Sequence, residues 1–309
     1  LTPTLRASRG IRGEPTQPDN PAGGLVWAAI SSQIEHPGSE SEWVSVADLP
    51  WESFKEHPWN LGGGGASELT SALEARQRKL DSLLERAIGF ASFPGQDDAF
   101  FLGTAWFQRN GISFPLRRPL VTGDVVRDWD TRCSEEALAP YDVNNNPVPY
   151  DLFSSWGRHL WSLRTTIGST TGFGGKTRAE SGEEWWTWYR WVKERYATPL
   201  SITFAEVATH NHFVLDRGGK VFKQTAPVIK LSKDATEDQH LELLGVLNSS
   251  TACFWLKQVC HKKGGASNSG GGSSDQPWSW SYQYNSARVS SFPLPASLPL
   301  DRARELDSL

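Results

Sequence analysis

The chain has 309 residues, of which 38% are hydrophobic and 21% are charged, and this length allows two domains or one large domain. The formal net charge of −4 argues against a protein that coats nucleic acid regardless of sequence, although a net value can hide a local basic patch. No apolar run approaches the roughly 18 residues that a membrane-spanning helix needs, so we expect a cytoplasmic protein with no membrane partner. The chain begins at Leu1 and contains no methionine, which indicates a fragment of a longer protein.

The N-terminal third predicts a loop, a strand and one long helix. Residues 1–24 are rich in Gly, Pro and Arg without periodicity, which is typical of a loop. Residues 42–51 alternate between apolar and polar side chains and predict a strand. After the four glycines at 62–65, leucines recur on one helical stripe, which predicts a linker helix within 66–95.

The remaining chain predicts short strands mixed with helices, an α+β fold. The aromatic-rich segment 183–197 predicts a helix whose rings mostly belong to the core. Residues 201–231 predict two or three strands, with a hairpin turn at the two glycines of DRGGK. Residues 237–263 predict a long helix, which Asn248–Thr251 either interrupts or starts again.

Charge is distributed unevenly along the chain. Residues 31–100 hold twelve Asp and Glu against five Lys and Arg, a net −7, whereas residues 158–233 hold twelve Lys and Arg against six Asp and Glu, a net +6. The basic stretch can present a positive surface to phosphates. Solvated faces on ordinary strands and a helix are an equally good interpretation of charge alone.

The stretch GSTTGFGGKT (168–177) has the residue types of a phosphate-binding loop but not their spacing. The pattern GxxxxGK[ST] requires a glycine five residues before Gly175, where this chain has Thr170. We therefore predict no nucleotide site. The glycines instead suit a close approach of the backbone to a DNA strand, with Lys176 and Arg178 meeting its phosphates.

Two further patterns are poor matches to functional motifs. NNNPVPY (144–150) resembles the Asn-Pro-Pro-Tyr motif that holds a flipped adenine, but Val148 separates the prolines and shifts Tyr150 out of register, so a plain turn is the better interpretation. His210 and His212 lack a nearby third ligand cluster of the kind a metal needs, and imidazoles also contact bases and phosphates.

Three cysteines are present, and their number and spacing argue against a disulfide framework. Cys133, Cys253 and Cys260 are odd in number and show no CxxC spacing. We therefore expect reduced thiols.

Several longer motifs follow one another in an order that resembles a known family. The specificity region of fused adenine-N6 DNA methyltransferases is similar to RRPLVTGDVVRDW (117–129), LLGVLNSSTACFWL (243–256) and RVSSFPLP (288–295). The PglX-type adenine-specific DNA methyltransferases of phage growth limitation and type 2 bacteriophage exclusion (BREX) systems are similar at RGIRGEP (9–15), GLVWAAI (24–30), GSESEWVSVADLPWESF (38–54) and HPWNLGGGGASEL (57–69).

This resemblance implies that the full-length protein methylates adenine N6 at specific sites, with S-adenosylmethionine as cofactor, in phage defence. It implies that this chain is the C-terminal, target-recognition part. We expect the end of the methyltransferase domain or a connector in 1–65, the linker helix in 66–95, and a β-rich recognition domain with packed helices in 96–309. The chain has neither a glycine-rich cofactor motif nor Asn-Pro-Pro-Tyr, so we assign it no catalytic, cofactor-binding or metal-binding residue and expect no transferase activity from it alone.

The resemblance also implies that the recognition domain closes on double-stranded DNA. Phosphate contacts would hold the register, and a few side chains would read base edges in the major groove. The candidates for phosphate contact are Arg158, Lys176, Arg178, Lys220, Lys223, Lys262 and Lys263. The candidates for base reading are Arg164, His210, Asn211 and His212.

Two other classes of function fit parts of the sequence. A protein-docking module could use the acidic region 31–100 to hold partner subunits of the defence system, and a DNA-mimicking phage inhibitor could occupy the basic surface. A carbohydrate-binding module is suggested by the content of 15 Trp and 28 Gly, but the basic strands and the cysteine pattern argue against it.

Overall fold

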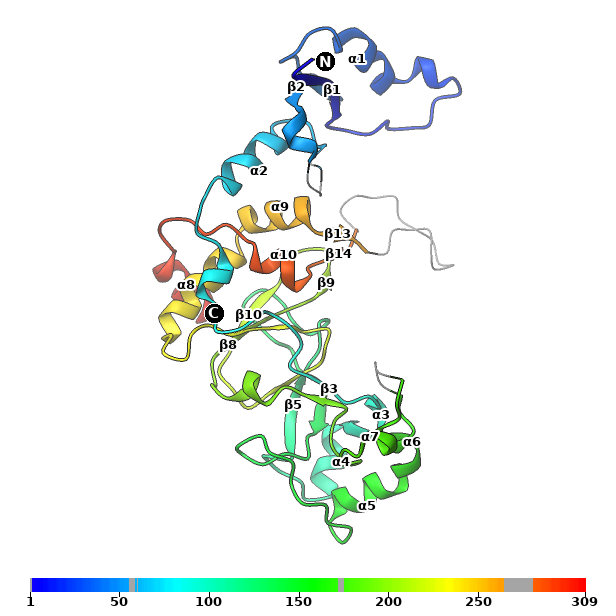
Figure 1. The fold of residues 1–309 in the computed structure, drawn as a ribbon, viewed down its shortest axis with the longest axis vertical. Helices are drawn as coiled ribbons and strands as arrows, with labels where there is room; N and C mark the ends of the chain where they lie inside the picture. Colours follow the sequence, from blue (N-terminus) through cyan, green and yellow to red (C-terminus); the bar gives the residue numbers. More distant parts are fainter. Residues whose placement is uncertain (1, 56–58, 60, 172–174, 264–279) are drawn as a thin grey trace. The chain divides into compact units, whose positions relative to one another are not determined.

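The computed structural model describes residues 2–55, 59, 61–171, 175–263 and 280–309. The chain divides into two compact units, Leu1–Gln77 and Arg78–Leu309 (Figure 1). The predicted α+β class is confirmed, because helices alternate with strands that form several small sheets. The predicted division at 65 and 95 into a methyltransferase end, a linker helix and a recognition domain stays a prediction.

The first unit is built on an antiparallel strand pair. β1 (Thr4–Gly10) pairs with β2 (Val44–Pro50) along its whole length, and α1 (Leu25–Gln33) lies between them in the sequence. β2 confirms the strand predicted over 42–51. The loop predicted over 1–24 is wrong for β1, because the strand is specified by its distant partner, which satisfies its backbone N–H and C=O groups, and not by local periodicity.

The linker helix is much shorter than predicted. α2 (Ala66–Glu74) begins where the leucine pattern starts, but the helix predicted across 66–95 ends after nine residues. Leu80–Leu83 is a short 3₁₀ helix, and the backbone N–H of Leu80 donates 2.9 Å to the carbonyl oxygen of Phe292. The leucine side chain itself is fully buried. Tertiary pairing with a segment roughly 200 residues away therefore overrides the local helical pattern.

The second unit contains strands shared among small sheets. One sheet has the order β11-β5-β6-β4, another β10-β8-β12, a third β13-β14-β9, and β3 pairs with β7. These strands are β3 (Ser92–Phe93), β4 (Phe101–Leu102), β5 (Arg117–Val121), β6 (Glu136–Leu138), β7 (Arg190–Trp191), β8 (Ser201–Phe204), β9 (Val207–Ala208), β10 (Phe213–Asp216), β11 (Val221–Phe222), β12 (Val228–Ile229), β13 (His261–Lys262) and β14 (Tyr282–Gln283).

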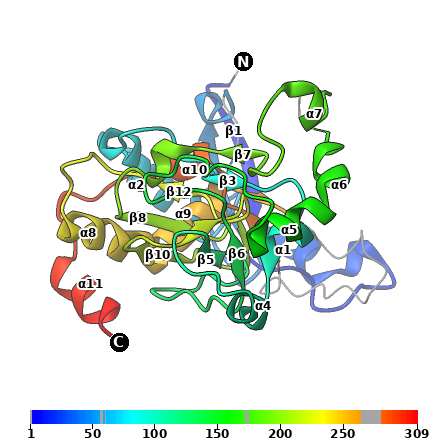
Figure 2. The same cartoon turned by 90° about the horizontal axis from the view of Figure 1, so that it is seen from below.

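Helices cover these sheets at both ends of the second unit. α8 packs on β8 and β10, α9 and α11 pack on α8, and α10 packs on α9 (Figure 2). The helices of this unit are α3 (Asp97–Phe100), α4 (Thr104–Arg109), α5 (Ser155–Ser162), α6 (Arg164–Gly168), α7 (Arg178–Ser181), α8 (Glu237–Leu247), α9 (Ser250–Val259), α10 (Ser286–Ser290) and α11 (Leu300–Asp307). No helix in the described ranges is long and apolar enough to cross a bilayer.

The aromatic-rich segment forms turns and one short strand, so the helix predicted over 183–197 is wrong. β7 pairs with β3, and only Lys193–Tyr196 forms a 3₁₀ helix. Trp188 is buried, and its indole N–H donates 3.0 Å to the carbonyl oxygen of Leu138. The expectation that the rings belong mostly to the core is confirmed, because the neighbouring tryptophans also pack against this cluster. The non-helical path of the chain lets Trp185, Trp186 and Trp191 pack against the same cluster.

The prediction that 201–231 forms strands is confirmed, but the segment has five short strands in place of two or three, and the predicted hairpin is wrong. β10 and β11 flank a turn in which Gly218 and Gly219 have φ values of +99° and +84°. However, β10 pairs with β8 and β11 pairs in parallel with β5, so the two strands enter different sheets. The turn thus connects two sheets of the second unit.

The long helix predicted over 237–263 is two helices. α8 starts with a capping box between Thr236 and Gln239. α9 is capped by Ser249, whose hydroxyl accepts from the N–H of Ala252. The second helix therefore begins within Asn248–Thr251, which is one of the two alternatives that the sequence left open. The three cysteines are free thiols, as expected.

The stretch 144–150 is a plain turn, as predicted. Asn145 has a φ of +61°, and the carboxylate of Asp142 accepts from the N–H groups of Asn144 and Asn146. The turn belongs to the fold and holds no base-binding motif.

Candidate nucleic-acid interface

Two residues predicted to contact DNA are buried. The Arg178 side chain is 2% exposed, and its Nε and Nη2 donate 3.1 and 2.9 Å to the carbonyl oxygen of Glu184. Burial lowers the pKa of this guanidinium. Asn211 is also buried, and its Nδ2 donates 2.5 Å to the carbonyl oxygen of Leu247. Both assignments are corrected, because these polar groups already bond inside the fold and cannot reach a ligand on the surface.

Two further candidate lysines form ion pairs with carboxylates. Nζ of Lys220 donates 2.6 Å to Asp216, and Nζ of Lys223 donates 2.5 Å to Asp97. Both side chains are half-buried. A phosphate would have to break these pairs, so neither lysine is a ready phosphate contact.

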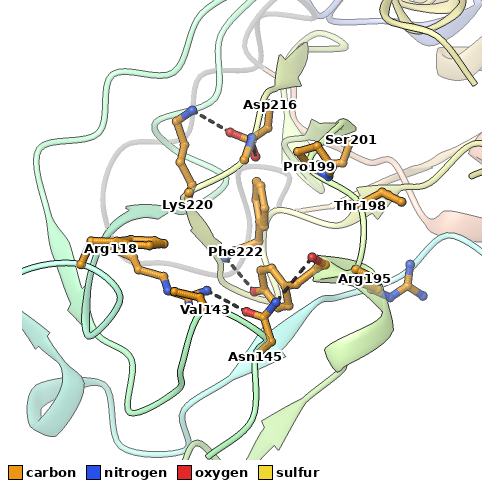
Figure 3. A pocket seen from close by; sticks show the side chains of 15 residues that line it. Arg118, Val143, Asn145, Arg195, Thr198, Pro199, Ser201, Asp216, Lys220 and Phe222 are labelled. Carbon is orange, nitrogen blue, oxygen red and sulfur yellow. Dashed lines mark hydrogen bonds and ion pairs between the residues drawn. The ribbon is translucent and has the colours of Figure 1, made fainter. Parts of the chain in front are cut away.

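Lys220 and Asp216 line a cavity of about 210 Å³ (Figure 3). The buried Arg118 extends toward Asn145 on its wall, donating 2.9 Å to Oδ1, and its remaining nitrogens donate to backbone carbonyls. Burial lowers the pKa of Arg118. Lys220 and Asp216 pair with each other, and the bonds from Arg118 to Asp142 and Asn145 hold the loop 142–145 in place.

A three-stranded sheet gathers several of the other candidates. β14 lies between β13 and β9, with Lys262 opposite Tyr282 and Tyr282 opposite Ala208. The pairing brings the segments 207–212, 261–263 and 280–283 together at one end of the second unit (Figure 1). We call these three segments, with Lys257 of α9, the basic sheet.

Cations on the basic sheet lie against aromatic rings. Nζ of Lys262 is 3.4 Å from the ring centroid of Trp280, and Nζ of Lys257 is 5.5 Å from that of Tyr282. Lys262 and Lys263 are exposed, and neither forms an ion pair with a described carboxylate. A cation held over a ring is already partly ordered, so it gives up little side-chain freedom on binding an anion.

The two predicted histidines lie beside these cations. His210 is exposed, and partial burial together with the charge of Lys257 lowers its pKa. A neutral imidazole offers one donor and one acceptor, which suits a base edge better than a phosphate. His212 is half-buried, and its Nδ1 is 2.7 Å from Oδ1 of Asp128, so its imidazole is oriented by a carboxylate.

The last candidates form a separate exposed group on α5 and α6. The guanidinium of Arg158 donates to the carbonyl oxygen of Phe153, and that of Arg164 lies 4.3 Å from the ring centroid of Trp161. Lys176 is exposed after α6, while residues 172–174 of the glycine-rich stretch lie outside the described residues. α5 and the basic sheet lie toward opposite ends of the second unit (Figure 1).

Sequence reasoning missed Lys257, Trp280, Tyr282 and Gln283 on the basic sheet. The alternation in WSWSYQY predicts a strand, because residues two apart on a strand share one face. No local pattern indicates that this strand pairs with 207–212, because β9 and β14 are far apart in the sequence. Nε2 of Gln283 donates 2.9 Å to Oε1 of Glu206, which fixes the orientation of this amide.

Comparison with known proteins gives one strong match. No family model matches the chain. An adenine-specific methyltransferase PglX from Streptomyces coelicolor is 43% identical over 311 aligned residues, which covers all of this chain and 26% of that protein. The chain thus spans about a quarter of the length of this relative.

Two solved structures are similar to this chain at a low level. The type IIL restriction-modification enzyme MmeI in complex with DNA is 14% identical, with a TM-score of 0.42 over 75% of this chain and 28% of that one. The type IIG restriction endonuclease BpuSI is 9% identical, with a TM-score of 0.48 over 91% of this chain and 33% of that one.

Proposed function

The resemblance to PglX-type adenine-specific methyltransferases holds along the whole chain, and from this premise we propose that the chain is the DNA-recognition segment of such an enzyme. The observation that carries the proposal is the 43% identity to PglX, in an alignment that covers all of this chain. In this proposal the longer protein methylates adenine N6 at specific sites in phage defence. Its S-adenosylmethionine is bound by the part outside this chain, and we assign no residue here to that cofactor.

The basic sheet is the proposed contact surface. The major groove of B-DNA accepts a two-stranded β-ribbon, and β13 and β14 are an antiparallel pair at the edge of the three-stranded sheet β13-β14-β9. Lys262 and Lys263 would contact phosphates and set the register, while the neutral imidazole of His210 would reach a base edge. Arg158, Arg164 and Lys176 would add a second contact along the same duplex.

Salt-dependent binding tests this proposal directly. Removing one phosphate-binding cation should flatten the plot of log K against log salt by about 0.9, so replacing Lys262 and Lys263 by Ala should flatten it by about 1.8. Binding to unrelated duplexes should weaken to a similar degree. Lys233→Ala is the matched control, because this exposed lysine lies elsewhere on the second unit beside Glu85. An unchanged slope in the double variant would remove the basic sheet from the interface.

A protein-docking role has one observation of its own in the first unit. α1 is apolar on most of its surface, yet Leu25 and the 53%-exposed Trp27 face solvent. A helix that is apolar all round is normally covered. A docking role predicts that Trp27→Ser abolishes association with another subunit of the defence system and leaves DNA binding intact. DNA recognition predicts the reverse for the lysine variants, and an acidic DNA-mimicking inhibitor would compete with DNA for the basic sheet.

A further inference from the structure

The loop before α5 exposes one phenylalanine almost completely. Phe153 is 87% exposed, and Leu152 beside it is also exposed. Both belong to residues 151–154, which we call the Phe153 loop. A single exposed apolar residue is ordinary, but a phenylalanine with so little contact to its own fold contributes almost nothing to stability.

Hydrogen bonds between side chains and backbone hold the Phe153 loop in one conformation. The N–H of Phe153 donates 2.9 Å to Oδ1 of Asp151, and the hydroxyl of Ser154 donates 2.7 Å to the carbonyl oxygen of Asp151. The same hydroxyl accepts 3.0 Å from the N–H of Gly157 and so caps α5. The loop is therefore fixed while the ring projects from it, and binding through the ring needs little ordering of the chain.

Close packing at Gly157 supports this fixed geometry. A Cβ added there would lie 1.8 Å from the carbonyl oxygen of Asp151, so only glycine allows the loop to approach the helix so closely. The hydroxyl of Tyr150 donates 2.8 Å to the carbonyl oxygen of the same glycine. The residues on either side of the loop thus anchor it to α5.

One exposed guanidinium lies beside the exposed ring. The guanidinium of Arg158 donates to the carbonyl oxygen of Phe153 and stays exposed. Arg164, which begins the next helix α6, lies over the ring of Trp161 on α5 and forms no ion pair with a described carboxylate. The nearby carboxylate is that of Asp151, and its Oδ1 is engaged by the loop backbone. An apolar tip beside a guanidinium group complements a stacked base step next to a phosphate.

We propose that the Phe153 loop is an apolar wedge that inserts between adjacent base pairs of duplex DNA and kinks it. The inference rests on the proposed function, since it requires that the chain bind DNA. Phe and Leu are residue types that unstack base steps in this way, and Arg158 would hold a neighbouring phosphate. The cost of kinking depends on the step, so the wedge contributes specificity at a flexible pyrimidine–purine step that no side chain reads directly.

The test compares intact duplex with a duplex that carries a single-nucleotide gap. Unstacking is already accomplished in the gapped duplex, so the wild-type chain should bind it about tenfold more tightly than intact duplex. Energy transfer between end-attached dyes should report a bent intact duplex. Phe153→Ala should abolish both the preference and the bend while keeping the salt slope. Phe114→Ala, at a 59%-exposed phenylalanine on another loop, is the matched control and should behave as wild type.

The outcomes separate this inference from the proposed function. If the wild-type chain binds neither duplex in a salt-dependent way, DNA recognition itself fails. If it binds both duplexes but Phe153→Ala keeps the bend and the gap preference, the wedge is wrong and DNA recognition stands. If Phe153→Ala instead abolishes self-association seen by sedimentation, the loop docks on a second copy of the chain, which also overturns the wedge.

Discussion

Nη2 of Arg178 donates a 2.9 Å hydrogen bond to the main-chain carbonyl oxygen of Glu184, inside the second unit. Its guanidinium also donates to the hydroxyl of Thr187. This arginine belongs to the most basic part of the sequence, and yet it stabilises the path of the chain from α7 to β7.

Arg178→Ala should therefore destabilise the fold and leave the affinity for DNA unchanged. Truncation removes the guanidinium that donates to the carbonyl oxygen of Glu184 and the hydroxyl of Thr187, and it leaves a cavity in place of a buried side chain. We expect the free energy of unfolding to fall by about 3 kcal/mol. Urea unfolding measures the effect. Lys176→Ala, two residues earlier and exposed, is the control and should leave stability unchanged. A flatter salt slope with normal stability in Arg178→Ala would contradict the structural role.

Asn211 and His210 should give opposite results although they are adjacent. Asn211→Ala removes a buried donor to the carbonyl oxygen of Leu247, so the free energy of unfolding should fall by about 1–3 kcal/mol. His210→Ala alters an exposed ring and should leave stability unchanged while reducing discrimination between DNA sequences. Thermal unfolding and competition with unrelated duplexes measure the two effects. Equal destabilisation by both variants would show that His210 is structural.

Two glycines at helices of the same region should respond differently to alanine. Gly157→Ala forces a Cβ against the carbonyl oxygen of Asp151, and we expect a decrease of about 3 kcal/mol in the free energy of unfolding. Gly168→Ala meets only the Cβ of Ala179 at 4.0 Å, so helix propensity should make it neutral or stabilising by up to about 1 kcal/mol. Urea unfolding distinguishes them, and similar stabilities would refute the close packing at Gly157.

The buried lysine Lys230 should make stability rise with pH above neutrality. The side chain is 1% exposed, its Nζ donates to the carbonyl oxygens of Thr198 and Leu200, and burial lowers its pKa from 10.5 to about 8. Between these two pKa values the unfolded chain holds a proton that the folded chain has released. Stability should therefore increase from about pH 8 upward, with a slope of at most about 1.4 kcal/mol per pH unit.

Comparison with Lys230→Met isolates this contribution. The difference in free energy of unfolding between wild type and Lys230→Met should shift in favour of wild type from about pH 7 to about pH 9.5. Lys233→Met replaces an exposed lysine and should follow wild type at every pH. A pH-independent difference for Lys230→Met would mean that the lysine keeps its ordinary pKa in the fold.

The sequence alone determined the features that depend on near neighbours. Alternation specified β2, capping residues specified the starts of α8 and α9, and the paired glycines specified the turn after β10. The ordered motifs predicted the resemblance to PglX-type proteins, which the similarity along the whole chain confirms. These signals are local or ordered along the chain, so they can be read without knowing which segments meet.

Only the tertiary structure decided which cations are free to act. Lys176 and Arg178 are two residues apart, but one is exposed and the other is enclosed by the segment 183–187. The basic sheet exists because β14 pairs with both β9 and β13, and the leucine stripe after α2 is broken because Leu80 pairs with Phe292. Exposure and pairing depend on interactions between distant segments, and the free energy of those interactions exceeds the preference of any single stretch for helix, strand or surface.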